Sequence, residues 1–111
     1  MQTFSDYRDG TLTICFQGEL DHCAAASALG AVEAAAEEYM PRQCRLDFSG
    51  LSFMDSSGIA VILRSDRLLR QSGGLVRIVG CNEQIRRVLE LSGLGDRIIA
   101  EKEQKEECEL F

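Results

Sequence analysis

Two hydroxyl groups and a carboxylate stand together in the run Asp55-Ser56-Ser57-Gly58, directly before a segment rich in apolar residues. We predict that a helix begins at this run, because Asp and Ser are preferred just before a helix. The first N–H groups of a helix have no partner within it and are partly positive, so an oxygen atom or a phosphate beside them is stabilised. A serine here therefore either caps the helix or accepts a phosphate. The local pattern alone favours a cap, although Ile59 and Ala60 stand where a capping box needs Glu or Gln.

The other polar residues offer few candidates for the active site of an enzyme. A serine hydrolase needs a histidine base, and the chain's single histidine, His22, lies far from Ser56 in the sequence, with no Gly-X-Ser-X-Gly motif. The glycine-rich motifs that bind nucleotide phosphates do not occur. The five cysteines lack Cys-X-X-Cys spacing, and Cys44 alternates with Leu46 and Phe48 like a small buried hydrophobic residue. We therefore expect no catalytic residues, no metal site and no cofactor.

The length and composition are typical of one domain with a hydrophobic core. The chain has 111 residues, of which 45% are hydrophobic, and its net charge is −6. This charge disfavours direct binding to nucleic acid and to anionic membranes. No apolar stretch approaches the roughly 20 residues that span a bilayer, and the first residues do not resemble a signal peptide. We expect a single domain over residues 1–111 that stays in the cytoplasm.

Five short segments are predicted to be β-strands. The segment at 11–17 alternates Leu12, Ile14 and Phe16 with smaller or polar residues, which is the pattern of a half-buried strand. The turn signal Asp9-Gly10 joins it to the preceding segment, so the chain is predicted to open with a hairpin. The predicted strands cover residues 3–7, 11–17, 44–49, 75–79 and 97–100.

Three segments between the strands have apolar residues at helical spacing. The first, at 23–40, follows the capping residue Asp21 and ends before Pro41. The second begins at the serines described above and ends at Ser72-Gly73-Gly74. The third is predicted to be capped by Asn82 and to end at Gly93. The apolar stripe of the first helix is predicted at Leu29, Val32, Ala36 and Tyr39.

Strands that alternate with helices indicate an α/β fold. After the hairpin we expect a mixed, mostly parallel sheet of about five strands, with right-handed crossovers that pack three to four helices against it. The acidic end of the chain is predicted to be a solvated helix or a frayed tail. It contains Glu101, Glu103, Glu106, Glu107 and Glu109.

Four motifs, in order along the chain, resemble the STAS domain in the form found in bacterial anti-sigma factor antagonists. The longest runs from Asp47 to Leu63 and includes the Asp-Ser-Ser-Gly run, and the other three are Gly18 to His22, Gly73 to Val79 and Val88 to Leu94. The runs Glu-Leu-Asp-His and Phe-Met-Asp-Ser-Ser-Gly are most similar to antagonists of the sporulation type. Four ordered matches are far more specific than one serine, and they favour phosphorylation over a simple cap.

The resemblance implies a STAS fold and a regulator that is not itself an enzyme. Antagonists of this family bind an anti-sigma factor that is also a serine kinase, and this binding frees a sigma factor. The kinase phosphorylates the first serine of the motif, here Ser56, and a serine phosphatase removes the phosphate. The partner-binding residues implied for this chain are Glu19, Asp21, His22, Asp55, Ser56, Ser57, Gly58 and Ile59.

Two departures from the family pattern affect these expectations. Cys23 and an alanine run stand where the first helix of the family usually begins with polar residues, so the exact partner contacts of the family near Asp21 are not carried over to this chain. In addition, the C-terminal element is short. The second interpretation is a STAS domain that binds a ligand or serves as a scaffold and is never phosphorylated. The length of a free-standing domain and the intact Asp-Ser-Ser-Gly run favour the antagonist, which we expect to be a monomer.

Overall fold

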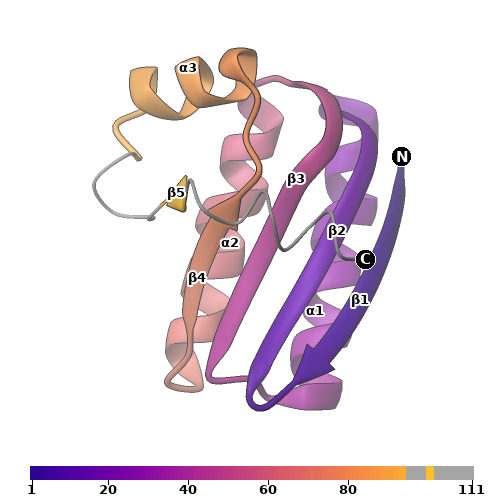
Figure 1. Ribbon diagram of the computed structural model, residues 1–111, viewed down its shortest axis with the longest axis vertical. Coiled ribbons are helices and arrows are strands. Elements are labelled where there is room, and N and C mark those ends of the chain that lie inside the picture. Colours follow the sequence, from indigo (N-terminus) through magenta and orange to yellow (C-terminus); the bar gives the residue numbers. More distant parts are fainter. Residues whose placement is uncertain (95–99, 102–111) are drawn as a thin grey trace.

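An opening β-hairpin is followed by helices and strands in alternation (Figure 1). The computed structural model describes residues 1–94 and 100–101. Within these ranges the strands are β1 (Gln2–Arg8), β2 (Thr11–Leu20), β3 (Gln43–Met54), β4 (Leu75–Val79) and β5 (Ala100–Glu101). The helices are α1 (His22–Tyr39), α2 (Ser56–Gln71) and α3 (Glu83–Leu91). The predicted α/β class and the opening hairpin are confirmed.

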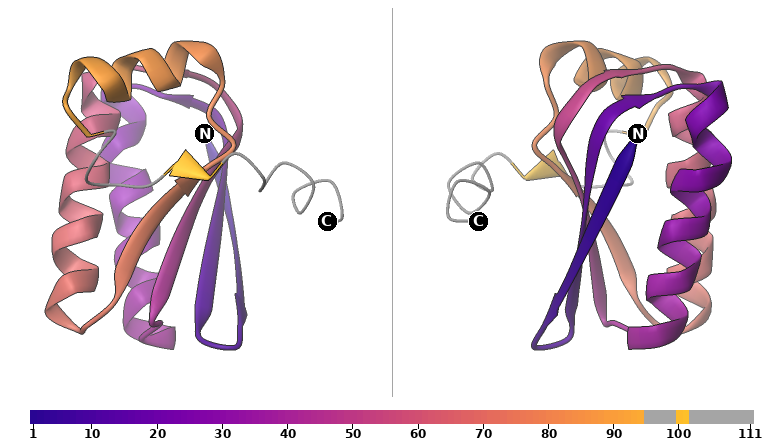
Figure 2. Two further views of the ribbon diagram at one scale, coloured as in Figure 1. Left: turned by 60° about the vertical axis from the view of Figure 1, so that its left-hand side comes forward. Right: turned by 90° about the vertical axis from the view of Figure 1, so that its right-hand side faces the viewer.

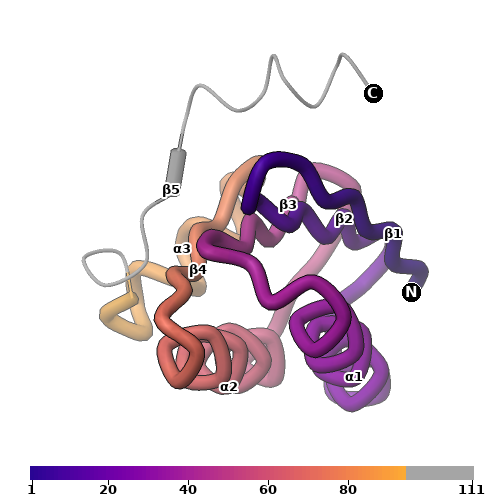
Figure 3. The backbone as a smooth tube through the Cα atoms, turned by 90° about the horizontal axis from the view of Figure 1, so that it is seen from below, coloured from indigo at the N-terminus to yellow at the C-terminus, as the bar shows by residue number. Residues whose placement is uncertain are grey.

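The strands form one mixed sheet in the order β1-β2-β3-β4-β5. β1 and β2 are antiparallel, whereas β2, β3, β4 and β5 run parallel to one another. Helices α1 and α2 lie side by side on one face of the sheet, as the view from below shows (Figure 3). α3 lies across the end of the sheet where β3 finishes (Figure 2). The helices therefore begin at the carboxyl edge of the parallel strands, which is where open α/β sheets place their binding sites.

The hydrophobic core lies between the sheet and the helices α1 and α2. Leu12, Ile14 and Phe16 of β2 are buried, and Phe16 meets Phe48 of β3 edge to face, with 5.4 Å between the ring centroids. Cys44 is buried as well, which confirms that it acts as a small hydrophobic residue. Removal of these side chains from water is the main stabilising contribution to such a fold.

The two central strands are longer at their carboxyl ends than the sequence predicts. β2 continues beyond Gln17 to Leu20, and β3 continues beyond Ser49 to Met54. Their parallel pairing persists through this stretch with two irregularities in register. Such an irregularity interrupts the alternation of side chains, and a pattern with period two then stops too early. The extension matters because it carries the ends of both strands, and the loops after them, to the same edge of the sheet.

The predicted apolar stripe of helix α1 is confirmed at Val32, Ala36 and Tyr39, which lie in or against the core, but not at Leu29. The buried residues of α1 are Ala28, Val32 and Ala35. Leu29 is only half-buried, so its predicted place in the core is wrong, and the small Ala28 takes that place. Tyr39 does pack against the core, and its ring stacks on Tyr7 of β1 with 4.8 Å between the centroids. Small side chains on the buried stripe allow a helix to approach its neighbours closely.

Beyond α3 the structure describes residues 92–94 and the short strand β5. This strand overlaps the predicted one at Ala100, whereas residues 97–99 and the acidic segment after Glu101 lie outside the described residues. In the described part of the chain, α1, α2 and α3 each lack the length or the apolar character that a membrane span needs.

Candidate functional site

Two aspartates at the carboxyl edge of the sheet cap the first two helices. Asp21 precedes α1, and its Oδ1 accepts a hydrogen bond of 3.0 Å from the backbone N–H of Ala24. Asp55 precedes α2, and its Oδ1 accepts a hydrogen bond of 2.8 Å from the backbone N–H of Ser57. Each carboxylate thus satisfies an N–H group at a helix start and lies at the positive end of the helix dipole. The predicted cap at Asp21 is confirmed.

Ser56 is the first residue of α2, and its hydroxyl is not the cap. The side chain is exposed and forms no hydrogen bond with the residues that the structure describes. Because Asp55 already satisfies the helix start, the interpretation of Ser56 as a simple helix cap is wrong. Its hydroxyl is therefore accessible to a partner molecule at the positive end of α2.

The capping loops of α1 and α2 lie next to each other (Figure 1). The N–H of Asp55 donates a hydrogen bond of 3.3 Å to the carbonyl oxygen of Leu20, which directly precedes the cap of α1. In the register of the two strands, Leu20 is the partner of Met54, and Glu19 is the partner of Phe53. The ends of β2 and β3 therefore hold the starts of α1 and α2 together, which unites the two motifs that the sequence analysis singled out.

The residues implied for partner binding all lie at this edge, but they differ in accessibility. The exposed ones are Glu19, His22 and Ser56, and the half-buried ones are Asp21, Asp55, Ser57 and Ile59. Gly58 is buried, because the start of α2 packs directly on Met54. A Cβ at Gly58 would overlap with the Met54 side chain and would lie 3.2 Å from Cδ2 of Leu20. The observed contribution of Gly58 is thus to packing, and a contact with a partner stays a prediction.

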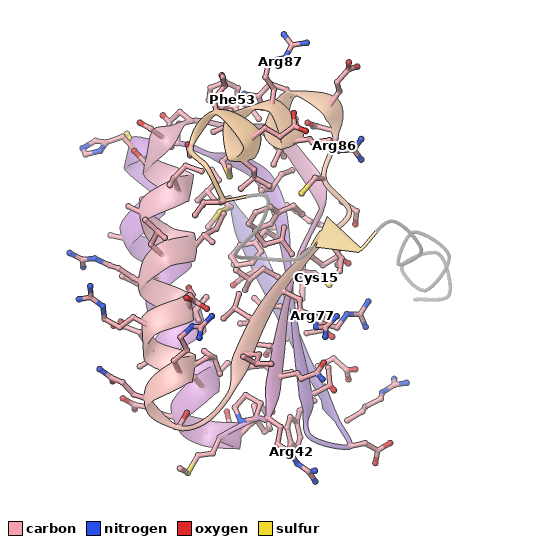
Figure 4. The ribbon with its side chains drawn as sticks, turned by 90° about the vertical axis from the view of Figure 1, so that its left-hand side faces the viewer. Cys15, Arg42, Phe53, Arg77, Arg86 and Arg87 are labelled. Carbon is pink, nitrogen blue, oxygen red and sulfur yellow. The ribbon has the colours of Figure 1, made fainter. Side chains whose placement is uncertain are left out.

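Phe53 is an exposed aromatic residue at this edge that the sequence pattern did not predict. Its side chain is 39% exposed near the end of β3. Figure 4 shows it at the same end of the molecule as Arg86 and Arg87 of α3. The predicted strand stopped at Ser49, so no face of a strand could be assigned to Phe53. An aromatic residue two positions before the cap Asp55 was the only available signal.

The sequence profile of the STAS domain matches residues 6–107. This chain belongs to the STAS domain family. The family that the sequence motifs indicated is thereby confirmed, together with its α/β fold. The match includes both capping loops and the whole of α2.

Relatives of this STAS domain are anti-sigma factor antagonists. The anti-sigma F factor antagonist of Paenibacillus polymyxa is 34% identical over 97 residues, which are 85% of this chain and 80% of that protein. The anti-sigma factor antagonist SpoIIAA in its unphosphorylated form is 26% identical, with a TM-score of 0.79 and coverage of 98% of this chain and 96% of that one. The Bacillus cell fate determinant SpoIIAA in its phosphorylated form is also 26% identical, with a TM-score of 0.70 and coverage of 99% and 100%. The similarity thus extends over nearly the full length of both SpoIIAA structures and over four fifths of the Paenibacillus protein.

Two cysteines of this STAS domain are kept protonated by their surroundings. Burial raises the pKa of the Cys44 thiol to about 12. Burial also raises the pKa of Cys81 to about 11, with a smaller lowering by the positive charge of Arg86 and a further increase from Asp47. A protonated thiol is a poor nucleophile and a poor metal ligand. Among the described residues, no three His, Cys, Asp or Glu side chains are grouped so that they could hold a metal ion.

We expect iodoacetamide at about pH 8 to modify Cys23 well before Cys44 and Cys81, because only the thiolate reacts. Cys23 is exposed in the first turn of α1, whereas the other two thiols keep their protons at this pH. Peptide mass spectrometry after a timed reaction measures the three rates. Urea-unfolded protein is the control, in which the three cysteines should react at similar rates. Equal rates in the folded protein would contradict the burial of Cys44.

Proposed function

We propose that this STAS domain is an anti-sigma factor antagonist that is switched by phosphorylation of Ser56. The carboxyl edge of its sheet binds an anti-sigma factor that is a serine kinase, and the bound kinase releases its sigma factor. Phosphorylation of Ser56 ends this complex, and a serine phosphatase restores the antagonist. The binding function is supported by the anti-sigma factor antagonists among its relatives.

The observation that carries the proposal is the difference between Asp55 and Ser56. Asp55 provides the cap of α2 through its bond of 2.8 Å to the N–H of Ser57. The adjacent Ser56 hydroxyl is exposed and has no structural bond to the described residues. A kinase needs such an accessible hydroxyl, which must reach the γ-phosphate of ATP in the active site of the kinase. Ser56 is thus a substrate, and the catalytic base and the ATP–magnesium site belong to the kinase.

The position of Ser56 also allows the free protein to accommodate a phosphate. The modification would add a charge of about −1.5 to −2 at the start of α2, where the positive end of the helix dipole favours an anion. Because Ser56 is exposed, the phosphate would keep most of its hydration. The phosphorylated form of SpoIIAA has a fold similar to this chain, which supports a modification that leaves the fold intact. The switch would then act on the interface.

Incubation with ATP and the anti-sigma kinase from the same genome tests the acceptor. We expect mass spectrometry to find one phosphate on Ser56, because its hydroxyl is the exposed one at the start of α2. Ser56→Ala should remain unmodified, whereas the matched variant Ser57→Ala should still be phosphorylated at Ser56. A phosphate on Ser57 of the wild-type protein would move the acceptor by one residue. The absence of any phosphate would contradict the proposed switch.

A further inference from the structure

Among the residues that the structure describes, no strand pairs with the last part of β3 on the side of β4. The pairing of β3 with β4 ends at Asp47 and Val79, whereas β3 continues to Met54. The first turn of α3 takes the place of a strand here. Nε2 of Gln84 donates a hydrogen bond of 2.8 Å to the carbonyl oxygen of Met54, and Oε1 of Gln84 accepts one of 3.1 Å from the N–H of Met54. The carboxamide of Gln84 thus satisfies both backbone polar groups of the last residue of β3.

Asn82 fixes the first turn of α3 against the same strand. Its Nδ2 donates a hydrogen bond of 3.2 Å to the carbonyl oxygen of Leu51 in β3. Its Oδ1 caps α3 by accepting a hydrogen bond of 2.8 Å from the N–H of Ile85, whose side chain is buried in the core. Since the start of α3 is anchored in this way, Gln84 is held at a fixed distance from Met54.

Met54 connects the Gln84 contact with the proposed phosphate acceptor. Its side chain is buried, and the start of α2 packs on it at Gly58. Its backbone continues directly into Asp55 and Ser56, and the N–H of Asp55 is bonded to the carbonyl of Leu20. The loop that carries Ser56 is therefore held by β2 on one side and by α3 on the other.

We infer that Gln84 is a positioning residue that holds the backbone from Met54 to Ser56 in the orientation in which the Ser56 hydroxyl meets the kinase. This inference rests on the proposed function of Ser56. A glutamine side chain suits the task because it offers both the donor and the acceptor that complement a residue's backbone C=O and N–H. Gln84 is exposed on α3, so the burial of apolar surface does not explain its contact with Met54.

Two variants of the full-length protein test the inference with the purified anti-sigma kinase and ATP. Gln84→Ala removes both hydrogen bonds, and Gln84→Glu puts an acceptor where Nε2 donates to the Met54 carbonyl. We expect kcat/KM for phosphorylation of Ser56 to fall by about tenfold to a hundredfold, because small displacements of a reacting group have effects of this size. The matched control is Gln71→Ala. Gln71 is exposed at the end of α2 and has no side-chain hydrogen bond to the described residues, so kcat/KM should not change.

Amide hydrogen exchange distinguishes positioning from a general loss of structure and needs no kinase. In Gln84→Ala we expect faster exchange at Met54 and Asp55 and unchanged exchange at Leu69 in the core. A wild-type kcat/KM for Gln84→Ala would overturn the inference and leave Ser56 as the acceptor. Faster exchange at Leu69 would also overturn it, because the fall in kcat/KM would then reflect lost stability. Wild-type protein that the kinase does not modify would refute the proposed function itself.

Discussion

Phosphorylation of Ser56 is expected to weaken the binding of the anti-sigma kinase by more than about a hundredfold, which corresponds to a loss of ~3 to 5 kcal/mol. The phosphate would lie beside the half-buried carboxylate of Asp55, with Glu19 and Asp21 at the same edge of the sheet. In a complex the phosphate would lose its hydration shell while carboxylates surround it. The burial of a charge without a compensating partner has a free-energy cost of this size. The free protein avoids the cost because Ser56 is exposed.

Isothermal titration calorimetry of the kinase with unmodified and enzymatically phosphorylated protein measures the effect. Ser56→Asp should weaken binding less than the phosphate does, because it adds a smaller charge. Ser56→Ala is the control for the hydroxyl itself. Its free energy of unfolding should stay within about 0.5 kcal/mol of wild type, because Asp55 and not Ser56 caps α2. Phosphorylated protein that binds as tightly as the unmodified protein would refute the switch.

The elements that the sequence predicts correctly are those whose signals are local. The strand at 75–79 has the predicted bounds, and Asp21 and Asn82 cap α1 and α3 as expected. The ends of β2 and β3 could not be predicted, because two irregularities in register interrupt the alternation of their side chains. Whether a strand continues past such a point depends on its pairing with a neighbour, and pairing is not a property of either segment alone.

At the candidate site, too, the sequence alone could not predict the roles of single residues. Asp55, Ser56 and Ser57 are all residue types that cap helices, so composition could not say which one does so. The backbone decides, since Asp55 is extended with a φ of −107° and Ser56 already belongs to the helix. The contact between Gln84 and Met54 joins residues 30 positions apart in the sequence. It depends on how α3 crosses the end of the sheet, which no local pattern reveals.

Gly58→Ala is expected to lower the free energy of unfolding by about 1 to 3 kcal/mol, although Ala is intrinsically the better helix former. Gly58 is buried in the first turn of α2, and a Cβ there would overlap with the Met54 side chain. Either the buried Met54 side chain or the start of α2 must shift to admit the methyl group, and a shift of α2 would move Ser56 with it. We therefore also expect slower phosphorylation of Ser56. Urea unfolding measures the stability, and the kinase assay measures the rate.

Gly30→Ala is the matched control, because Gly30 is also a helical glycine. No described atom outside its own helix turn lies within 4 Å of a Cβ at Gly30, so only helix propensity should act, and stability should rise by roughly 0.5 to 1 kcal/mol. Met54→Val in the Gly58→Ala background tests the cause, since a smaller side chain at 54 makes room for the methyl group and should restore part of the lost stability. If Gly58→Ala were as stable as wild type, α2 would not pack tightly on Met54. The inference that packing on Met54 fixes the position of Ser56 relative to the end of β3 would then be wrong.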